Sequence, residues 1–384
     1  MNSQKWLSVN FFTFFFTWGV FLPYWTGWLV NGKDLSVTAA GAIMGVAMMV
    51  RAFSTLLLYP LLTKRFSLSF VMQLLGILAL VAMLFYIPTN AYTVLFIVTV
   101  IFSAIYPNLL PGMESGATLL LRKDHIHYGK ARAFGSLGYT IALVVVGTVS
   151  QFFGISAVLW VMVFGLLSIV CSQFLFIPVA LKEKPQRMLA KEDGASLKDL
   201  LSERGFLIVL FISILLQGAH ASYYNYGYVY LDQLHVNGFT IGLILNVAII
   251  IEILFFAIAD RYFSEMKVST MYCIAATGSS LRWIIILVFP SVAMFIVSQL
   301  FHAISFGIAH YAFIQYISRK LKPGLISTAQ GMYSALAMSL SVAVLTFLGA
   351  YLYKISPQYA FAGMLVCSIP ALLLTIFTKR KYQY

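Results

Sequence analysis

Eight ionisable side chains lie inside long apolar runs of this sequence, where water cannot solvate them. They are two glutamates, three arginines and three histidines: Glu114, Glu252, Arg51, Arg132, Arg282, His220, His302 and His310. A charge at the centre of a membrane helix costs about 2.5–3.5 kcal/mol on insertion scales, so such residues usually bind a ligand or carry a proton. The arginines outnumber the glutamates, which favours an anionic ligand. The alternative for each residue is a structural pair that fixes the contacts between helices.

Glu114 and Arg132 lie on either side of a predicted cytoplasmic turn. Two antiparallel helices joined by a short turn place such residues at a similar depth, and pairing offsets the cost of removing each charge from water. We expect Arg132 to hold a substrate carboxylate, because its planar fork can bind one bidentately. Glu114 is then its partner in the empty state. An arriving anion would release Glu114, and the freed carboxylate would take up a proton.

Glu252, Arg282 and His302 come from three consecutive apolar runs, so one bundle of helices can bring them together. We expect Glu252 to carry a proton and Arg282 to promote its release. His302 is the natural second member, because imidazole changes its charge near physiological pH. His310 follows two turns later on a similar face. The alternative is a static pair of Glu252 with Arg282, with the histidines held by hydrogen bonds.

A run of tyrosines at residues 223–230 has two interpretations. It is either an aromatic belt at the membrane interface, or the lining of an entrance. In the second interpretation Tyr223, Tyr226 and Tyr230 share one helical face and present hydroxyl groups to a carboxylate. Asn225 within the run favours the second interpretation.

The sequence contains no HExxH, GxSxG, Walker A or CxxC motif, so nothing favours an enzyme. The cysteines Cys171, Cys273 and Cys367 are scattered in apolar runs and suit neither a disulfide framework nor a metal site. His125 and His127 belong to a charged loop. We expect no metal and no cofactor, with a proton gradient as the source of energy.

The composition requires a membrane. Hydrophobic residues make up 61% of the 384 residues and charged residues only 10%, whereas soluble domains have about 25% charged residues. Apolar stretches of about 20 residues cross the bilayer as helices. The sequence predicts an all-α chain with twelve spans, near 7–29, 39–62, 68–88, 92–118, 129–153, 155–180, 206–231, 239–259, 268–289, 291–316, 327–353 and 358–378.

The basic residues predict the orientation. Twenty of the 25 Lys and Arg residues lie on one set of loop faces and only Lys33 and Lys354 on the other. Because basic loops stay in the cytoplasm, both termini are predicted to lie there, in a bacterial inner membrane. The net charge of +13 therefore reflects membrane orientation and not nucleic-acid binding.

A single long polar segment, residues 181–205, divides the chain into residues 1–180 and 206–384, each with six predicted spans. Two parallel six-helix halves around a central cavity are the architecture of the major facilitator superfamily.

Several motifs resemble one branch of that superfamily. Residues 128–139, YGKARAFGSLGY, are similar to the YG-x-x-R-x-x-GS-x-x-(Y/F) signature of the 3-phenylpropionate transporter family and its lactose/proton symporter relatives. The first span around residues 14–25, the two-histidine segment with His302 and His310, and residues 330–335 are also similar to this group.

The resemblance implies proton-coupled uptake of a small aromatic carboxylate such as 3-phenylpropionate, by a protein that works as a monomer in membrane lipid. It implies substrate binding by Glu114 and Arg132 and proton coupling by Glu252, Arg282 and His302. Tyr139 keeps an aromatic ring where a sugar would stack, and Ser305 replaces the carboxylate that carries the proton in the lactose relative.

Two other classes of function remain open. One is a proton symporter for a sugar or nucleoside on the same scaffold. The other is a membrane protein that does not transport, either a sensor or a lipid-modifying enzyme. A sensor usually adds a soluble output domain, which argues against it here.

Overall fold

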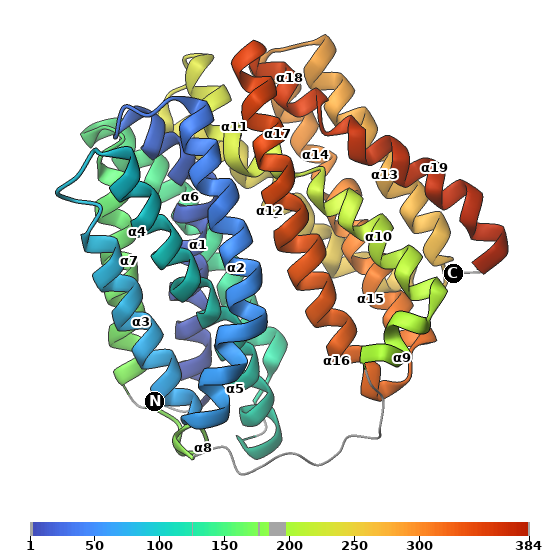
Figure 1. Cartoon of the computed structure of the whole chain (residues 1–384), viewed down its shortest axis with the longest axis horizontal. Helices are drawn as coiled ribbons and strands as arrows, with labels where there is room; N and C mark the ends of the chain where they lie inside the picture. The colour runs from blue at the N-terminus through green and yellow to red at the C-terminus, as the bar shows by residue number, and fades with distance from the viewer. Residues whose placement is uncertain (1–2, 125, 176, 184–196, 383–384) are drawn as a thin grey trace. The chain divides into compact units, whose positions relative to one another are not determined.

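The structure is a computed structural model that describes residues 3–124, 126–175, 177–183 and 197–382. Every regular element in these residues is a helix (Figure 1), which confirms the prediction of an all-α chain. His125 and residues 184–196 of the predicted linker lie outside the described residues.

Eleven helical runs in the described residues are long and apolar enough to cross a membrane. They are Ser3–Asn31, Val37–Arg65, Tyr92–Leu121, Tyr128–Phe153, Ala157–Phe174, Arg204–Gln233, Gly238–Phe263, Val268–Val288, Val292–Lys320, Thr328–Ile355 and Pro357–Lys381. The third predicted span corresponds to a shorter apolar helix, Leu68–Leu84, of 17 residues. The protein is therefore a multi-pass membrane protein, while the count of twelve spans stays a prediction.

The chain divides into two compact units. Unit 1 comprises Met1–Met188 with Val236–Leu243, and unit 2 comprises Leu189–His235 with Ile244–Tyr384. The helices of unit 1 are α1 (Ser3–Asn31), α2 (Val37–Arg65), α3 (Leu68–Leu84), α4 (Tyr92–Ile105), η1 (Tyr106–Asn108), α5 (Leu109–Asp124), α6 (Tyr128–Phe153), α7 (Ala157–Phe174) and α8 (Val179–Lys182). The start of α12 also belongs to unit 1.

Glycines allow α1 to lie close to α6 in unit 1. A β-carbon at Gly138 would collide with the backbone carbonyl of Phe12, and one at Gly135 would lie 2.6 Å from the Phe15 ring. In membranes, where the surrounding lipid is as apolar as the side chains, small residues let helices gain van der Waals contact. The two glycines therefore place α6 directly against the aromatic residues of α1.

Serine caps and a buried lysine hold the loops of unit 1. Ser36 and Ser67 each accept a hydrogen bond from a backbone amide in the first turn of α2 and α3, which satisfies a donor that the helix leaves open. Lys33 is only 8% exposed. Its Nζ donates to the carbonyl of Thr89 (2.7 Å) and to Asn90 Oδ1 (3.0 Å). Burial lowers the pKa of Lys33. This lysine therefore ties the loop after α1 to the loop before α4.

The helices of unit 2 are α9 (Leu197–Ser202), α10 (Arg204–Gly218), α11 (Ala221–Gln233), α12 (Gly238–Phe263), α13 (Val268–Val288), α14 (Val292–Leu300), η2 (Ala303–Ile308), α15 (Ala309–Lys320), α16 (Pro323–Met332), η3 (Tyr333–Leu340), α17 (Ser341–Ile355), α18 (Pro357–Ala362) and α19 (Leu365–Tyr382). The elements η2 and η3 are π-helical. Such turns occur often at functional sites.

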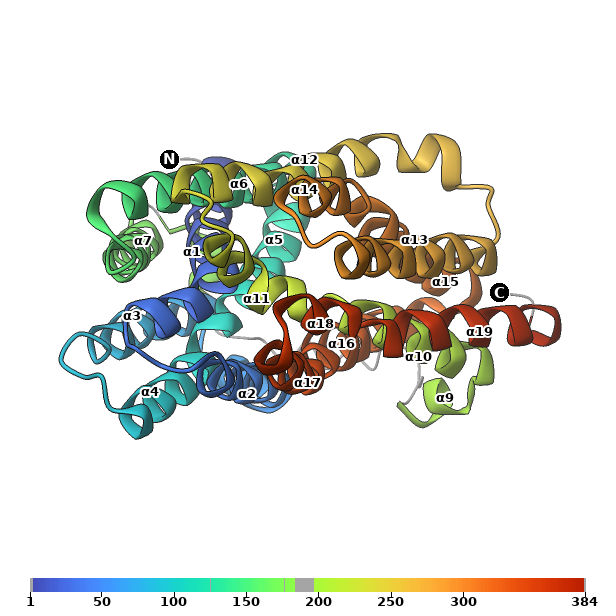
Figure 2. The same ribbon diagram turned by 90° about the horizontal axis from the view of Figure 1, so that it is seen from above.

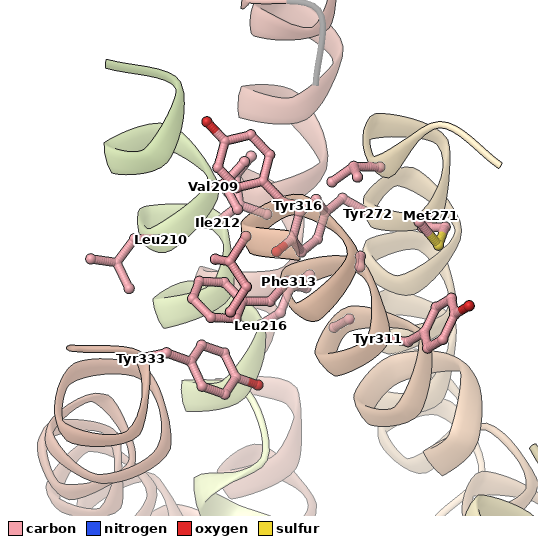
Figure 3. Close-up of a cluster of buried hydrophobic side chains, with 14 of the residues drawn as sticks. Val209, Leu210, Ile212, Leu216, Met271, Tyr272, Tyr311, Phe313, Tyr316 and Tyr333 are labelled. Atoms are coloured by element: carbon pink, nitrogen blue, oxygen red, sulfur yellow. The ribbon is translucent and has the colours of Figure 1, made fainter. Parts of the chain in front are cut away.

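The core of unit 2 contains buried side chains of α10, α13 and α15 (Figure 3). Phe313 of α15 stacks on Tyr333 with ring centroids 4.2 Å apart. Ser213 of α10 and Tyr272 of α13 share a hydrogen bond of 2.8 Å within this core. Close packing and hydrogen bonds of this kind hold membrane helices together.

Candidate functional site

The side chains of Glu114 and Arg132 meet in unit 1, at the turn between α5 and α6. Arg132 Nε lies 3.7 Å from Glu114 Oε1, and the side chains are 37% and 38% exposed. That distance is longer than a hydrogen bond. The other oxygen of Glu114 accepts a 2.8 Å hydrogen bond from the Tyr128 hydroxyl. The pair is therefore loose and accessible, and Tyr128 holds the carboxylate in position.

Arg132 also lies against an aromatic surface. Its guanidinium carbon is 4.1 Å from the centre of the Phe15 ring and 5.8 Å from that of Phe11. Both rings belong to α1, which the glycines of α6 bring close. A cation over a ring face is attracted by the ring quadrupole. One guanidinium thus borders a carboxylate and aromatic rings together.

Arg51 lies at the middle of α2 and has an aromatic neighbour in place of an acid. Its guanidinium carbon is 4.6 Å from the centre of the Trp18 ring. Trp18 in turn stacks near Phe14 and Tyr106, with ring centroids 6.1 Å away in each case. Among the described residues no carboxylate lies within 4.0 Å of Arg51. No carboxylate in the described part of the chain therefore balances this guanidinium by direct contact.

Tyr139, the last residue of the sequence motif, is partly buried on α6. A β-carbon at Gly19 of α1 would lie only 3.0 Å from the backbone carbonyl oxygen of Tyr139. The close approach of α1 and α6 therefore continues along the helices to this level.

In unit 2, His302 links Glu252 to Arg282. Its Nε2 lies 3.2 Å from Glu252 Oε2 and its Nδ1 lies 3.0 Å from Arg282 Nη1. Arginine can only donate, so Nδ1 accepts and the hydrogen of the neutral imidazole is assigned to Nε2, pointing at the carboxylate. The structure therefore brings together the three residues expected to converge, with the imidazole in the middle.

Arg282 is completely buried and is held by polar groups from α14 and η2. Its Nη2 donates to Gln299 Oε1 (3.3 Å) and its Nη1 to Ser305 Oγ (3.4 Å). The guanidinium also lies 4.6 Å from the ring centre of Tyr223 and equally far from that of Trp283. These contacts hold both terminal nitrogens of the guanidinium, while its buried Nε has no hydrogen-bond partner among the described residues.

His220, at the break between α10 and α11, extends this network. Its Nδ1 is 2.9 Å from the carbonyl of Leu216 and must donate to it, so the neutral ring accepts at Nε2 from Ser305 Oγ, 3.0 Å away. We call the set of Glu252, His302, Arg282, Ser305 and His220 the Arg282 network. Every bond in it is compatible with neutral imidazoles.

His310 belongs to a neighbouring set of hydrogen bonds. Its Nδ1 is 2.9 Å from the hydroxyl of Tyr333, which accepts from Gln217 Nε2 at 2.9 Å. The ring of Phe306 stacks between the two histidines, almost parallel to His302 (4°) and to His310 (1°). The two histidines therefore share a face, but an apolar ring separates their polar networks.

The expected common face of the tyrosine run is divided in the structure. Tyr223 and Tyr230 both contact Phe295, whereas Tyr226 is fully buried and donates to the carbonyl of Thr346 in α17 (2.8 Å). Tyr226 therefore faces α17, and its hydroxyl is committed to a hydrogen bond within the protein.

Residues 5–362 match the sequence model of the MFS_1 like family. The chain belongs to this family. A probable 3-phenylpropionic acid transporter of Escherichia coli (strain K12) is 26% identical over 97% of both chains. The maltose permease of Geobacillus stearothermophilus is 25% identical over 97% of this chain and 93% of its own length.

Solved structures with the same fold are also transporters. The nucleoside transporter NupG superposes with a TM-score of 0.79 at 15% identity, over the whole of both chains. The peptide transporter POT in complex with sulfate superposes with a TM-score of 0.75 at 13% identity, over 99% of this chain and 94% of its own. This MFS_1 like protein therefore has the major facilitator fold and is a secondary transporter, not an enzyme.

The sequence does not predict that His220, Gln299 and Ser305 lie around Arg282. His220 stands out only as an intramembrane histidine, and Ser305 only as the replacement of a carboxylate in the lactose relative. A signal for two of them exists, because Gln299, His302 and Ser305 are spaced by three residues within an apolar run. That spacing puts them on neighbouring positions of one helix face.

Proposed function

We propose that this protein takes up a small aromatic carboxylate, such as 3-phenylpropionate, with a proton across the bacterial inner membrane. The observation that carries the proposal is the position of Arg132 between Glu114 and the rings of Phe15 and Phe11. A ligand with a carboxylate and a phenyl ring matches both neighbours of this guanidinium. The similarity to a probable 3-phenylpropionic acid transporter supports the same substrate class.

Binding would exchange one carboxylate for another at Arg132. A free carboxylate can bind two guanidinium nitrogens at once. Glu114, in contrast, has its Oε1 3.7 Å from Arg132 Nε and uses its other oxygen to accept a hydrogen bond from Tyr128. The substrate would therefore displace Glu114. The released carboxylate, in a site that its ligand has partly dehydrated, would favour its neutral form and take up a proton. This exchange couples substrate binding to proton uptake.

The Arg282 network would supply the second proton site. The Glu252 side chain is 23% exposed, while that of His302 is 3% exposed. Glu252 is thus the more accessible of the two, and His302 would pass any change in its charge to Arg282. In alternating access, a small movement of α12 against α13 would change the distance between these groups and release the proton.

A sugar or nucleoside symporter is the second candidate, and the similarity to a maltose permease favours it. The surplus of positive charge among the intramembrane residues nevertheless favours an anionic substrate over an uncharged sugar. Arg51 lies over the Trp18 ring and, among the described residues, forms no ion pair, so it offers a second anchor for an anion.

The proposal predicts that Arg132→Lys loses most substrate binding, because a point charge does not replace the planar fork. Uptake of labelled 3-phenylpropionate by energised membrane vesicles, with and without a protonophore, measures the effect. Arg51→Lys is the matched variant. If Arg132 is the anchor, Arg51→Lys keeps more uptake than Arg132→Lys. The reverse order would move the anchor to Arg51, and protonophore-sensitive uptake of a sugar without uptake of the acid would refute the substrate class.

A further inference from the structure

A large basic cavity lies at one end of unit 2, apart from the residues described so far. Its volume is about 990 Å³, and it is lined by the start of α13, the end of α15 and the end of α19. Within residues 3–124, 126–175, 177–183 and 197–382 the lining includes no acidic residue and five basic ones: Lys267, Arg319, Lys320, Lys379 and Arg380. Helices α15 and α19 both pack against α13, and Figure 2 shows the three together.

The basic residues of this cavity form no direct ion pairs within the part of the chain that the structure describes. Among the described residues none of the five basic side chains lies within 4.0 Å of a carboxylate. Arg319 donates instead to the backbone carbonyls of Ser264 and Met266 in the turn before α13. Like charges that share a cavity repel one another, so the cavity favours an anion of more than one charge. The hydroxyls of Ser269 and Thr270 add donors for oxygen atoms.

The cavity lies at the membrane boundary. It is lined by residues at the start of the membrane-length helix Val268–Val288 and at the ends of Val292–Lys320 and Pro357–Lys381. Immediately inward on α19, Phe377 is 77% exposed and Leu373 is 47% exposed. A phospholipid would fit both features. Its acyl chains would cover the exposed apolar side chains, and its phosphate would enter the basic cavity.

We propose that this cavity binds the headgroup of an anionic phospholipid. Basic pockets between membrane helices are suited to such headgroups, and the volume leaves room for the two phosphates of cardiolipin. A soluble polyanion would use the charges but not the exposed apolar face of α19. The proposal does not depend on the identity of the transported substrate.

The test uses the full-length protein in detergent and three substitutions that leave the helices intact, Lys320→Gln, Lys379→Gln and Arg380→Gln together. Native mass spectrometry with added cardiolipin measures binding, and phosphatidylethanolamine is the zwitterionic comparison. A matched triple variant, Lys64→Gln, Arg65→Gln and Lys182→Gln, removes the same charge from unit 1. We expect the unit 2 variant to bind cardiolipin at least about tenfold more weakly and the unit 1 variant to stay within about twofold of the unmodified protein.

Thermal unfolding gives a second readout that does not depend on mass spectrometry. Without added lipid, both variants and the unmodified protein should unfold at similar temperatures, because all six residues are exposed. Cardiolipin should then stabilise the unmodified protein and the unit 1 variant but not the unit 2 variant. Equal loss of binding in both variants, equal binding of phosphatidylethanolamine, or displacement of cardiolipin by ATP or inorganic phosphate would each overturn the proposal.

Discussion

His302 shows how a single residue can connect two charges of opposite sign. Its Nδ1 faces the donor Arg282 and its Nε2 faces the acceptor Glu252. Protonation of Nδ1 would remove the hydrogen bond to Arg282 and place two positive groups in contact. The imidazole therefore transmits the state of Glu252 best while it stays neutral, and the proton is expected to reside on the carboxylate.

At the same scale we predict that Glu252→Gln abolishes uphill accumulation of substrate but allows exchange across the membrane. The amide oxygen of glutamine can still accept from His302 Nε2, so the network keeps its shape, but the side chain cannot take up a proton. Accumulation and counterflow in the same vesicles separate these two activities. Glu265→Gln, at an exposed position, is the control. Full proton-driven accumulation by Glu252→Gln would disprove the carrier role, and loss of both activities would indicate a structural pair.

At the scale of elements, the contact between α1 and α6 decides the position of Arg132. The motif residues Gly135 and Gly138 face α1 and bring Phe15 under the guanidinium. Gly129 belongs to the same motif and has nothing within 4 Å of an added β-carbon. The spacing of the motif thus serves contact between helices as much as ligand binding.

This difference predicts the effect of two substitutions on α6. Gly138→Leu must push α1 away, since backbone atoms of Phe12 occupy the space, and overpacking of this kind costs about 1–3 kcal/mol. We expect a lower temperature of unfolding and weaker substrate binding. Gly129→Ala should be neutral or slightly stabilising, because alanine has the higher helix propensity. Thermal unfolding and uptake assays compare the two variants, and equal stability of both would contradict the proposed role of Gly138.

At the scale of the whole molecule, the basic residues predict how the chain crosses the membrane. Lys33 is one of two basic residues on the predicted outer faces, and the structure gives it a local role as a tie between loops. Lys33 therefore has a structural role on the outer face, where basic residues are otherwise rare. The number of membrane crossings is even only if the 17-residue helix α3 also crosses, and only an even number places both termini on one side.

Reporter fusions test this topology directly. A reporter that is active only outside the cytoplasm should be silent when fused after Tyr384 and active when fused after Asn90, if α3 crosses and basic loops stay inside. Activity after Tyr384 would disprove the predicted orientation. Silence after Asn90 with activity after Tyr384 would show that α3 does not cross, because eleven crossings place the two termini on opposite sides of the membrane.

Hydropathy and charge in the sequence predicted the helical class, the approximate spans and the intramembrane residues. These properties follow from composition along the chain, because an apolar run must become a helix in lipid whatever its neighbours are. The motif at residues 128–139 also pointed to the family, which the match over residues 5–362 confirmed.

Only the tertiary structure decided which polar groups meet. The break before α11 brings His220 to Ser305 over a long separation in sequence, and packing against α17 directs the Tyr226 hydroxyl to the carbonyl of Thr346. The basic cavity of unit 2 likewise needs the ends of three helices to come together. Contacts between helices depend on their rotation and on local breaks, and neither property is encoded in the hydropathy of a single span.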